Sequence, residues 1–275
     1  MTDANTLRMR LLALPLLVVF AVLVVWPLTS IVIDSFDAQG EISLANYRTV
    51  LESTYYRQSF VTSLWISVLT TGIGIALGIL LAIALRARGG GVRRFALAFG
   101  SMGANFAGVP LAMAIIILFG MNGFFTILVG KLGLPGGFNV YSLAGLVIAY
   151  CYFQIALATL LLTPAFDAVP AEIEEAAALM GVSSARFWLR VGLPIVARQI
   201  VAIAILLFAN AMGTFATTYA LTGTSVNVVT IAISDLVSGD IFSDPNLANA
   251  IALVLLVVLL VPIVASQFLA RERRP

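Results

Sequence analysis

The stretch EEAAALMGVSSARFWLRVGLP, which runs from Glu174 to Pro194, stands between two long apolar runs of the sequence. Pro170 suits the first turn of a helix, and the glutamates after it crowd the end where the helix dipole favours negative charge. Alanines, a leucine and a methionine extend this helix to Gly181, a residue type that commonly ends helices in the left-handed conformation. A serine pair then caps a second short helix, Ala185–Val191, which a Leu-Pro pair closes. The stretch therefore predicts two short helices joined at a glycine elbow, the first acidic and the second aromatic and basic.

The composition around this elbow is that of a membrane protein. Of the 275 residues, 61 % are hydrophobic and 10 % are charged, whereas soluble domains carry about a quarter charged residues. The mean hydropathy is +1.08. One cysteine, Cys151, and no histidine exclude an internal disulfide, a Cys/His zinc site and catalysis by Ser-His-Asp or Cys-His groups. These properties exclude a soluble globular enzyme, a disordered chain and a disulfide scaffold, and they predict an all-α polytopic membrane protein.

Six apolar stretches are long enough to cross a bilayer, since a helix needs about 20 residues to span the hydrocarbon core. None of them contains Asp, Glu, Lys or Arg, although Asn105 and Pro110 interrupt the third. The first stretch follows Arg8 and Arg10, as the core of a secretory signal does. It is longer than such a core and no cleavage site follows it, so we expect a retained helix. We expect one transmembrane domain over residues 1–275, with spans at about 11–33, 60–85, 97–119, 141–162, 200–221 and 247–269.

The basic residues lie mainly on one side of these predicted spans. Of the 15 lysines and arginines, twelve fall in the N-terminal segment, the second and fourth connections and the C-terminal segment. Cytoplasmic loops of membrane proteins carry an excess of Lys and Arg. The pattern therefore predicts that both termini and the elbow are cytoplasmic.

The elbow also resembles a known motif. Glu175-Ala176-Ala177, then three residues, Gly181, nine residues, Val191, one residue and Leu193-Pro194 are similar to the pattern E-A-A-x3-G-x9-I-x-L-P. That pattern is the EAA loop of binding-protein-dependent ABC importer permeases. Valine in place of isoleucine at position 191 is the only departure from it.

The resemblance implies a type I ABC importer permease fold, with six transmembrane helices and both termini in the cytoplasm. In that family the EAA loop, here residues 164–198, is a coupling helix seated in a groove of a cytoplasmic ATPase. The positions carried over as ATPase-docking residues are Glu175, Ala176, Ala177, Gly181, Leu193 and Pro194. From the residues alone, the alternative is a pair of interfacial helices with Trp188 among the lipid headgroups.

Partners and a location follow from the same resemblance. Such a permease works with a second permease, homologous or identical, with two cytoplasmic ABC ATPase subunits and with an extracytoplasmic substrate-binding protein, in the cell membrane of a bacterium. The sequence has no G-x-x-x-x-G-K-[ST] motif, so ATP and Mg²⁺ would be used by the partner ATPase. We expect this chain to bind no cofactor, metal or nucleic acid of its own and not to be an enzyme.

A path for solute needs polar groups inside the helices, and these are densest in the fifth predicted span. The candidate path residues are Gln154, Asn210, Thr214, Thr217 and Tyr219. Such residues also form hydrogen bonds between membrane helices, which is the alternative. In the second span, the small-residue stripe Gly74-x3-Gly78-x3-Ala82 predicts a close contact with another helix.

Two rival classes of protein lack the residues that they need. A self-sufficient secondary carrier needs ionisable groups inside the membrane for its coupling ion, and the predicted spans hold none. A membrane enzyme, such as a lipid-modifying transferase, needs a cluster of Asp, His or Lys at the interface. The acidic cluster Glu172–Glu175 belongs to the elbow instead.

The solute class is suggested by resemblance only. The runs AMGTFA, from Ala211, and YALTG, from Tyr219, are similar to those of spermidine/putrescine-type permeases, so a polyamine is the expected solute. Permeases for thiamine, ferric iron, sulfate and phosphonates are also similar, and they remain alternatives. A polycation favours carboxylates along its path, and the predicted spans contain none. Whether the permease pairs with itself or with a sister chain stays open.

Overall fold

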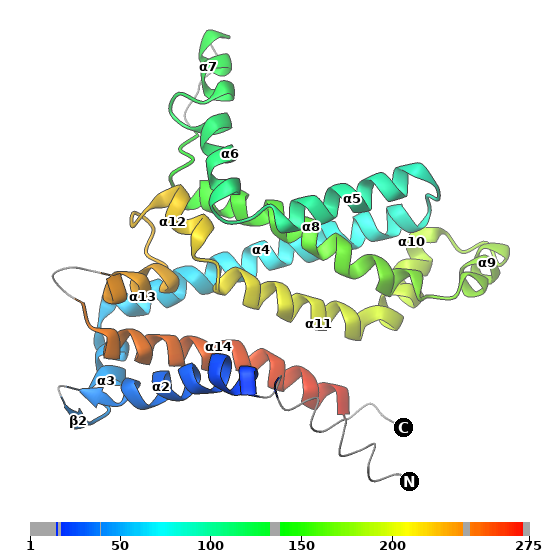
Figure 1. Cartoon of the computed structure of the whole chain (residues 1–275). Helices are drawn as coiled ribbons and strands as arrows, with labels where there is room; N and C mark the ends of the chain where they lie inside the picture. Colours follow the sequence, from blue (N-terminus) through cyan, green and yellow to red (C-terminus); the bar gives the residue numbers. More distant parts are fainter. Residues whose placement is uncertain (1–14, 16–17, 39, 133–137, 239–242, 272–275) are drawn as a thin grey trace, which may run out of the picture. The chain divides into compact units, whose positions relative to one another are not determined.

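The computed structural model describes Pro15 and residues 18–38, 40–132, 138–238 and 243–271. Within these ranges the chain is mostly helical (Figure 1), and six helices are long and apolar enough to cross a membrane. This confirms the predicted all-α membrane architecture. The chain divides into two compact units, Met1–Arg57 with Ala232–Val258 and Gln58–Ile231 with Leu259–Pro275. The single domain over residues 1–275 and the orientation of the termini stay predictions.

The first unit begins with a helix that changes from η1 (Ala21–Val25) to α2 (Trp26–Ser35). The strands β1 (Asp37–Ala38) and β2 (Glu41–Ile42) form a small antiparallel hairpin before α3 (Ala45–Glu52). The Asn46 side-chain amide in α3 donates to the carbonyl oxygens of Ser35, at 3.1 Å, and Asp37, at 2.9 Å. The hairpin is therefore fixed between the end of α2 and the start of α3.

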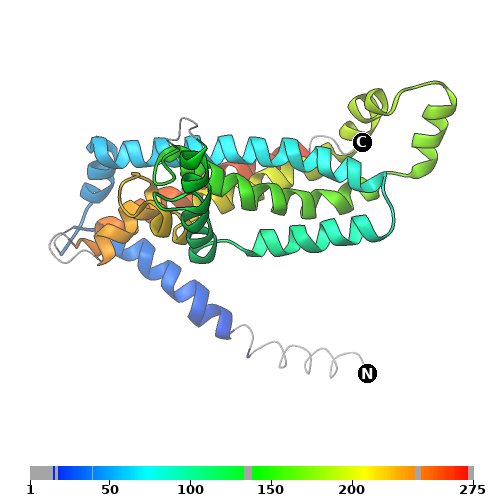
Figure 2. The same ribbon diagram turned by 90° about the horizontal axis from the view of Figure 1, so that it is seen from above.

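The second unit is built around α4 (Thr54–Arg86), α8 (Leu143–Asp167) and α11 (Leu193–Met212). The helix α5 (Gly91–Asn105) runs alongside α8 (Figure 2), and α11 also packs against α8. A Cβ added to Gly78 of α4 would lie 2.7 Å from the Cβ of Ala158 in α8. The predicted close contact of the small-residue stripe is therefore confirmed, and such contacts are what hold helices together in lipid.

The third predicted span is wrong as a single helix over residues 97–119. The structure has α5 ending at Asn105 and α6 (Val109–Phe119) starting after a break, followed by α7 (Phe124–Lys131). Gly108 in the break has φ = +75°, a conformation that favours glycine. Pro110 stands in the first turn of α6, where its missing N–H costs nothing, rather than in the middle of a helix. The apolar helical span here is Val109–Lys131.

The fifth predicted span, 200–221, is also displaced. The continuous apolar helix runs over Ser184–Met212. It consists of α10 (Ser184–Phe187), η2 (Trp188–Gly192) and α11. The chain then breaks at residues 213–215 and resumes as the short α12 (Ala216–Thr222).

The second, fourth and sixth predicted spans overlap with α4, α8 and α14 (Pro245–Arg271), with ends that differ by up to six residues. The first predicted span starts outside the described residues, and the helix of its described part reaches Ser35. A short apolar helix, α13 (Val229–Ser238), precedes α14. Asp244 caps α14 by accepting a hydrogen bond from the Leu247 N–H at 3.0 Å.

Candidate functional site: the elbow at Gly181

The first arm of the elbow is α9 (Ala171–Leu179), with Glu172 and Glu174 in its first turn. Pro170 was predicted in that first turn, but it lies at the N-cap with an extended ψ of 133°. The helix therefore starts one residue later than expected. The two carboxylates lie where the partial positive charge of the helix end stabilises them.

Gly181 ends this arm as the sequence predicts. Its φ is +78°. The N–H of Val182 donates to the Ala177 carbonyl at 3.0 Å, and the N–H of Gly181 donates to the Ala178 carbonyl at 2.9 Å. These two bonds form a Schellman motif, which satisfies carbonyls that the helix end would leave unpaired. Val182 packs on the same apolar cluster as Ala177, so the turn of the elbow is fixed by bonds and by packing.

The second arm was predicted to end at Leu193-Pro194. In the structure it continues instead into the membrane-spanning helix α11. The Leu193 N–H bonds to the Trp188 carbonyl, five residues back, which is the π-helical pattern of η2. Pro194 has no N–H and its ring collides with the preceding turn of a regular α-helix, and a π-turn is one way to absorb this irregularity. Ser183 is the N-cap of α10, but its side chain makes no capping hydrogen bond.

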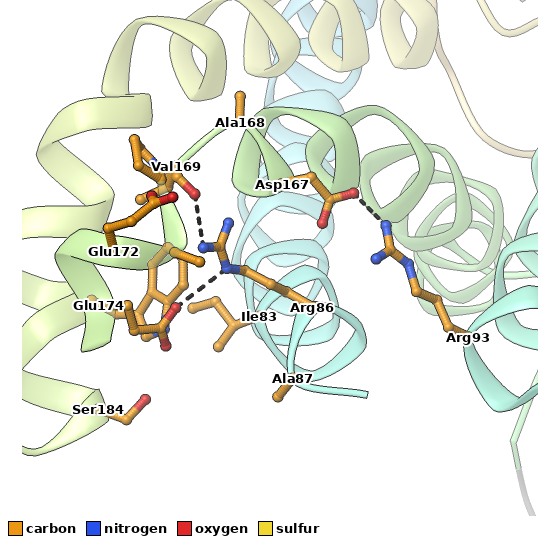
Figure 3. Close-up of a pocket in the computed structure, with 13 residues that line it drawn as sticks. Ile83, Arg86, Ala87, Arg93, Asp167, Ala168, Val169, Glu172, Glu174 and Ser184 are labelled. Atoms are coloured by element: carbon orange, nitrogen blue, oxygen red, sulfur yellow. Dashed lines mark hydrogen bonds and ion pairs between the residues drawn. The ribbon is translucent and has the colours of Figure 1, made fainter. Parts of the chain in front are cut away.

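Arg86, the last residue of α4, anchors the base of the elbow (Figure 3). Its Nε lies 3.3 Å from Oε2 of Glu174 in α9, and its Nη2 donates to the Val169 carbonyl at 2.8 Å. Its Nη1 donates to the Phe166 carbonyl near the end of α8. The guanidinium carbon also lies 5.4 Å from the ring centroid of Trp188. One side chain thus contacts the end of α8, α9 and η2.

A second ion pair lies beside this anchor. Arg93, near the start of α5, pairs with Asp167 at the end of α8 (Figure 3). Both pairs line a cavity of about 760 Å³ that also includes Glu172, Ser184 and Trp188. The base of the elbow is therefore polar and partly open, with each arginine facing a carboxylate.

Sequence reasoning counted Arg86 only as one of the charges that set the orientation, and it missed this role. The partners of Arg86 are 80, 83 and 88 residues further along the chain. No local spacing could identify them. The one available signal was an arginine directly at the end of a long apolar helix.

The predicted docking residues fall into two groups. Glu175, Ala176, Gly181 and Pro194 are exposed, and Leu193 is half-buried. Ala177 is buried, in the same cluster as Phe187 and Trp188. The tip of the elbow adds two apolar side chains that the motif does not include, Leu179, which is 91 % exposed, and Met180, which is 76 % exposed.

The two helix breaks meet each other inside the second unit. The backbone N–H of Gly108, in the break between α5 and α6, donates to Oγ1 of Thr217 in α12 at 2.8 Å. The carbonyl of Thr214, in the break before α12, accepts from Tyr150 Oη at 3.1 Å and from Thr230 Oγ1 at 3.2 Å. Side chains thus satisfy backbone groups that the breaks would leave unpaired, as buried backbone requires.

The predicted path residues differ in their exposure to solvent. Gln154 is fully buried, and its Nε2 donates to the Leu207 carbonyl at 2.9 Å. Thr217 is fully buried as well, as the acceptor for Gly108. Asn210 is exposed, Thr214 is half-buried, and Tyr219 is 53 % exposed.

Residues 74–274 match a known family, the binding-protein-dependent transport system inner membrane component. The chain belongs to this family. Its members are multi-pass proteins of the bacterial inner membrane and the permease components of ABC importers. The family that the elbow motif suggested is therefore confirmed.

Several curated permeases in this family are similar to the chain. The thiamine transport system permease protein ThiP of Salmonella typhimurium is 28 % identical over 81 % of this chain and 42 % of its own length. The trehalose permease SugB of Mycobacterium tuberculosis is 24 % identical over 89 % of this chain and 83 % of its own length. The sn-glycerol-3-phosphate permease UgpA of Yersinia pestis is 27 % identical over 68 % and 66 %. The chain spans less than half the length of the thiamine permease that it matches.

Solved importers of the same kind share the fold. A bacterial ABC transporter that imports the acidic polysaccharide alginate matches with a TM-score of 0.81, at 16 % identity, over 99 % of this chain and 98 % of that one. The MetNI methionine ABC transporter matches with a TM-score of 0.60, at 15 % identity, over 81 % and 100 %. The likeness confirms the expected ABC importer permease fold.

Proposed function

We propose that this chain is the membrane-spanning permease subunit of an ATP-driven importer for a small solute. It forms the translocation path with a second permease, homologous or identical, and receives solute from an extracytoplasmic binding protein. Its elbow docks on a separate ATPase, which uses ATP and Mg²⁺. Family membership supports this proposal, as do the permeases and ABC transporters that it resembles.

The exposure of two apolar side chains at the tip of the elbow is the observation that supports docking. Leu179 and Met180 are 91 % and 76 % exposed. They lie next to the turn at Gly181, which a hydrogen bond from Val182 to the carbonyl of the buried Ala177 stabilises. Exposed apolar side chains that lie together mark a site of interaction with a protein or with a membrane. Trp188 argues against an elbow that merely lies among lipid headgroups, because it is 4 % exposed and lies under the Arg86 guanidinium.

The solute that this path suits best is an organic cation, and a polyamine is our specific choice. Phe215 and Tyr219 stack with their ring centroids 5.4 Å apart, and both rings are exposed. An aromatic face attracts an ammonium group without a carboxylate, and nearby Asn210 and Thr214 supply neutral polar groups. The residue resemblance at 211–223 supports a polyamine. The thiamine permeases among the relatives are named for another organic cation, whereas trehalose and sn-glycerol-3-phosphate are not cations.

Docking is tested by co-purification from mild detergent, with the bound chains identified by mass spectrometry. Wild type should recover an ATPase subunit. Leu179→Asp should lose it, because the exposed tip tolerates the change in the fold but an apolar groove does not accept the charge. Glu172→Gln, at the far end of α9, is the matched control and should retain the ATPase. A folded wild-type protein that purifies without any ATPase contradicts the proposal.

The solute class is tested by uptake into vesicles that contain the reconstituted complex. Radiolabelled spermidine, thiamine, trehalose and sn-glycerol-3-phosphate are compared under the same ATP supply. Spermidine should be imported, and Tyr219→Leu should reduce its uptake more than Tyr219→Phe does. Thiamine uptake alone would keep the organic cation and reject the polyamine. Uptake of trehalose or glycerol phosphate alone would reject both.

A further inference from the structure

Arg86, at the end of α4, contacts the end of α8 and both arms of the elbow. Its guanidinium donates to the Phe166 carbonyl in α8 and to the Val169 carbonyl just after it, and it pairs with Glu174 in α9. It also lies over the ring of Trp188, which belongs to the helical run that continues into α11. Arg86 therefore ties the end of α4 to both arms of the elbow and to the end of α8.

Arg86 is more buried than the arginine of the neighbouring ion pair. Its side chain is 13 % exposed and that of Arg93 is 31 % exposed, whereas the two carboxylate partners, Glu174 and Asp167, are similarly exposed at 35 % and 33 %. Charge-assisted hydrogen bonds are stronger than neutral ones, and a planar guanidinium can serve several acceptors in fixed directions. Removing Arg86 leaves two backbone carbonyls and one carboxylate without this donor. The ammonium group of a lysine can replace the guanidinium only in part.

Packing continues the connection from this cluster into the membrane. Ala82 of α4, Phe166 of α8 and Phe187 and Trp188 of the elbow belong to one buried cluster. One turn above Ala82, Gly78 approaches Ala158 so closely that an added Cβ would lie 2.7 Å away. Close-packed interiors transmit displacements because they cannot compress. The C-terminal parts of α4 and α8 are thus packed against each other and against the elbow.

We propose that Arg86 is a positioning residue that transmits displacement of the elbow to α4 and α8. This inference rests on the proposed function and adds a step to it. The exposed tip at Leu179 and Met180 binds the ATPase, and Arg86 passes the movement of the bound elbow to the membrane helices. Docking and transmission are therefore carried by different residues.

The test separates docking from coupling in the reconstituted complex. ATPase co-purification, ATP hydrolysis and solute uptake are measured for wild type, Arg86→Gln, Arg86→Lys and Glu174→Gln. Arg86→Gln should keep the ATPase bound and hydrolysing, while the solute imported per ATP falls by roughly tenfold, within the usual range of coupling between sites. Glu174→Gln, which leaves the carbonyl contacts in place, should reduce it less. Arg86→Lys should restore only part of the loss.

The matched control is Arg88→Gln. Arg88 lies two residues further on, is exposed and carries the same charge, so its loss should leave uptake per ATP unchanged. If Arg86→Gln fails to fold, Glu174→Gln and Arg86→Lys still decide the question. A ratio of uptake to hydrolysis equal to wild type in the folded Arg86 variants overturns the inference, as does an equal fall in Arg88→Gln. Absence of any ATPase from the wild-type complex would instead overturn the proposed function.

Discussion

Gly78 of α4 and Ala158 of α8 lie so close that a Cβ added to Gly78 would come 2.7 Å from the Cβ of Ala158. The Cδ1 of Leu162 would lie 3.1 Å away. The two helices can approach to this distance only because position 78 has no side chain. Ala82, one turn further along α4, is fully buried in the cluster that also includes Ala158 and Leu162.

Gly78→Val should therefore force the two helices apart. Overpacking of this kind costs about 1–3 kcal/mol, and thermal unfolding of the purified protein in detergent should show a lower midpoint. Gly72→Val is the control, because nothing lies within 4 Å of a Cβ at position 72. Equal midpoints for the two variants would show that the contact is not as tight as described.

Gly181→Ala should weaken the turn of the elbow through its backbone alone. No atom lies within 4 Å of a Cβ at this position, but φ is +78°, and the left-handed conformation costs a residue with a Cβ about 1–2 kcal/mol. Hydrogen exchange of residues 176–182 should therefore speed up. Gly181→Asn should be milder, since asparagine adopts this conformation more readily. Exchange that is unchanged in Gly181→Ala would contradict the assigned turn.

Thr217→Val should destabilise the junction between the two helix breaks. It removes the acceptor of the Gly108 N–H, and an unpaired buried donor costs about 1–3 kcal/mol. Thr217→Ser keeps the hydroxyl and should lie close to wild type in the unfolding midpoint. Thr49→Val is a useful control, because the Thr49 hydroxyl is exposed and bonds only within its own helix. If Thr217→Val lowers the unfolding midpoint no more than Thr49→Val does, the hydrogen bond between Gly108 and Thr217 does not stabilise the junction.

Arg93→Gln should have a small effect on stability. The pair with Asp167 is about a third exposed on each side, and exposed ion pairs contribute about 0–1 kcal/mol. Raising the salt concentration should shrink the difference from wild type further, since salt screens exposed charges. The unfolding midpoint at low and high salt measures both effects. A loss larger than that of Arg86→Gln would reverse the order that burial assigns to the two arginines.

The amino-acid sequence determined the class of the protein and the character of its elbow. Long runs without charge require helices that cross a membrane, and this property depends on composition alone. Gly181 was predicted as the turn of the elbow because helix endings are set by a few neighbouring residues. The motif from Glu175 to Pro194 led to the family because its spacing is local.

Only the tertiary structure decided where helices break and which side chains are buried. Asn105 and Pro110 marked the third span as irregular, and polar residues gather around Gly213. Composition alone could not locate the breaks, because hydrogen bonds between distant segments stabilise them. Gln154 and Thr217 are buried in contacts between helices, which no local pattern showed, and their place on a solute path stays a prediction. Arg86 could not be found, because its partners lie 80 residues or more away in the chain. The physical reason is the same in each case: turns and spans depend on neighbours in the sequence, whereas burial and ion pairing depend on neighbours in space.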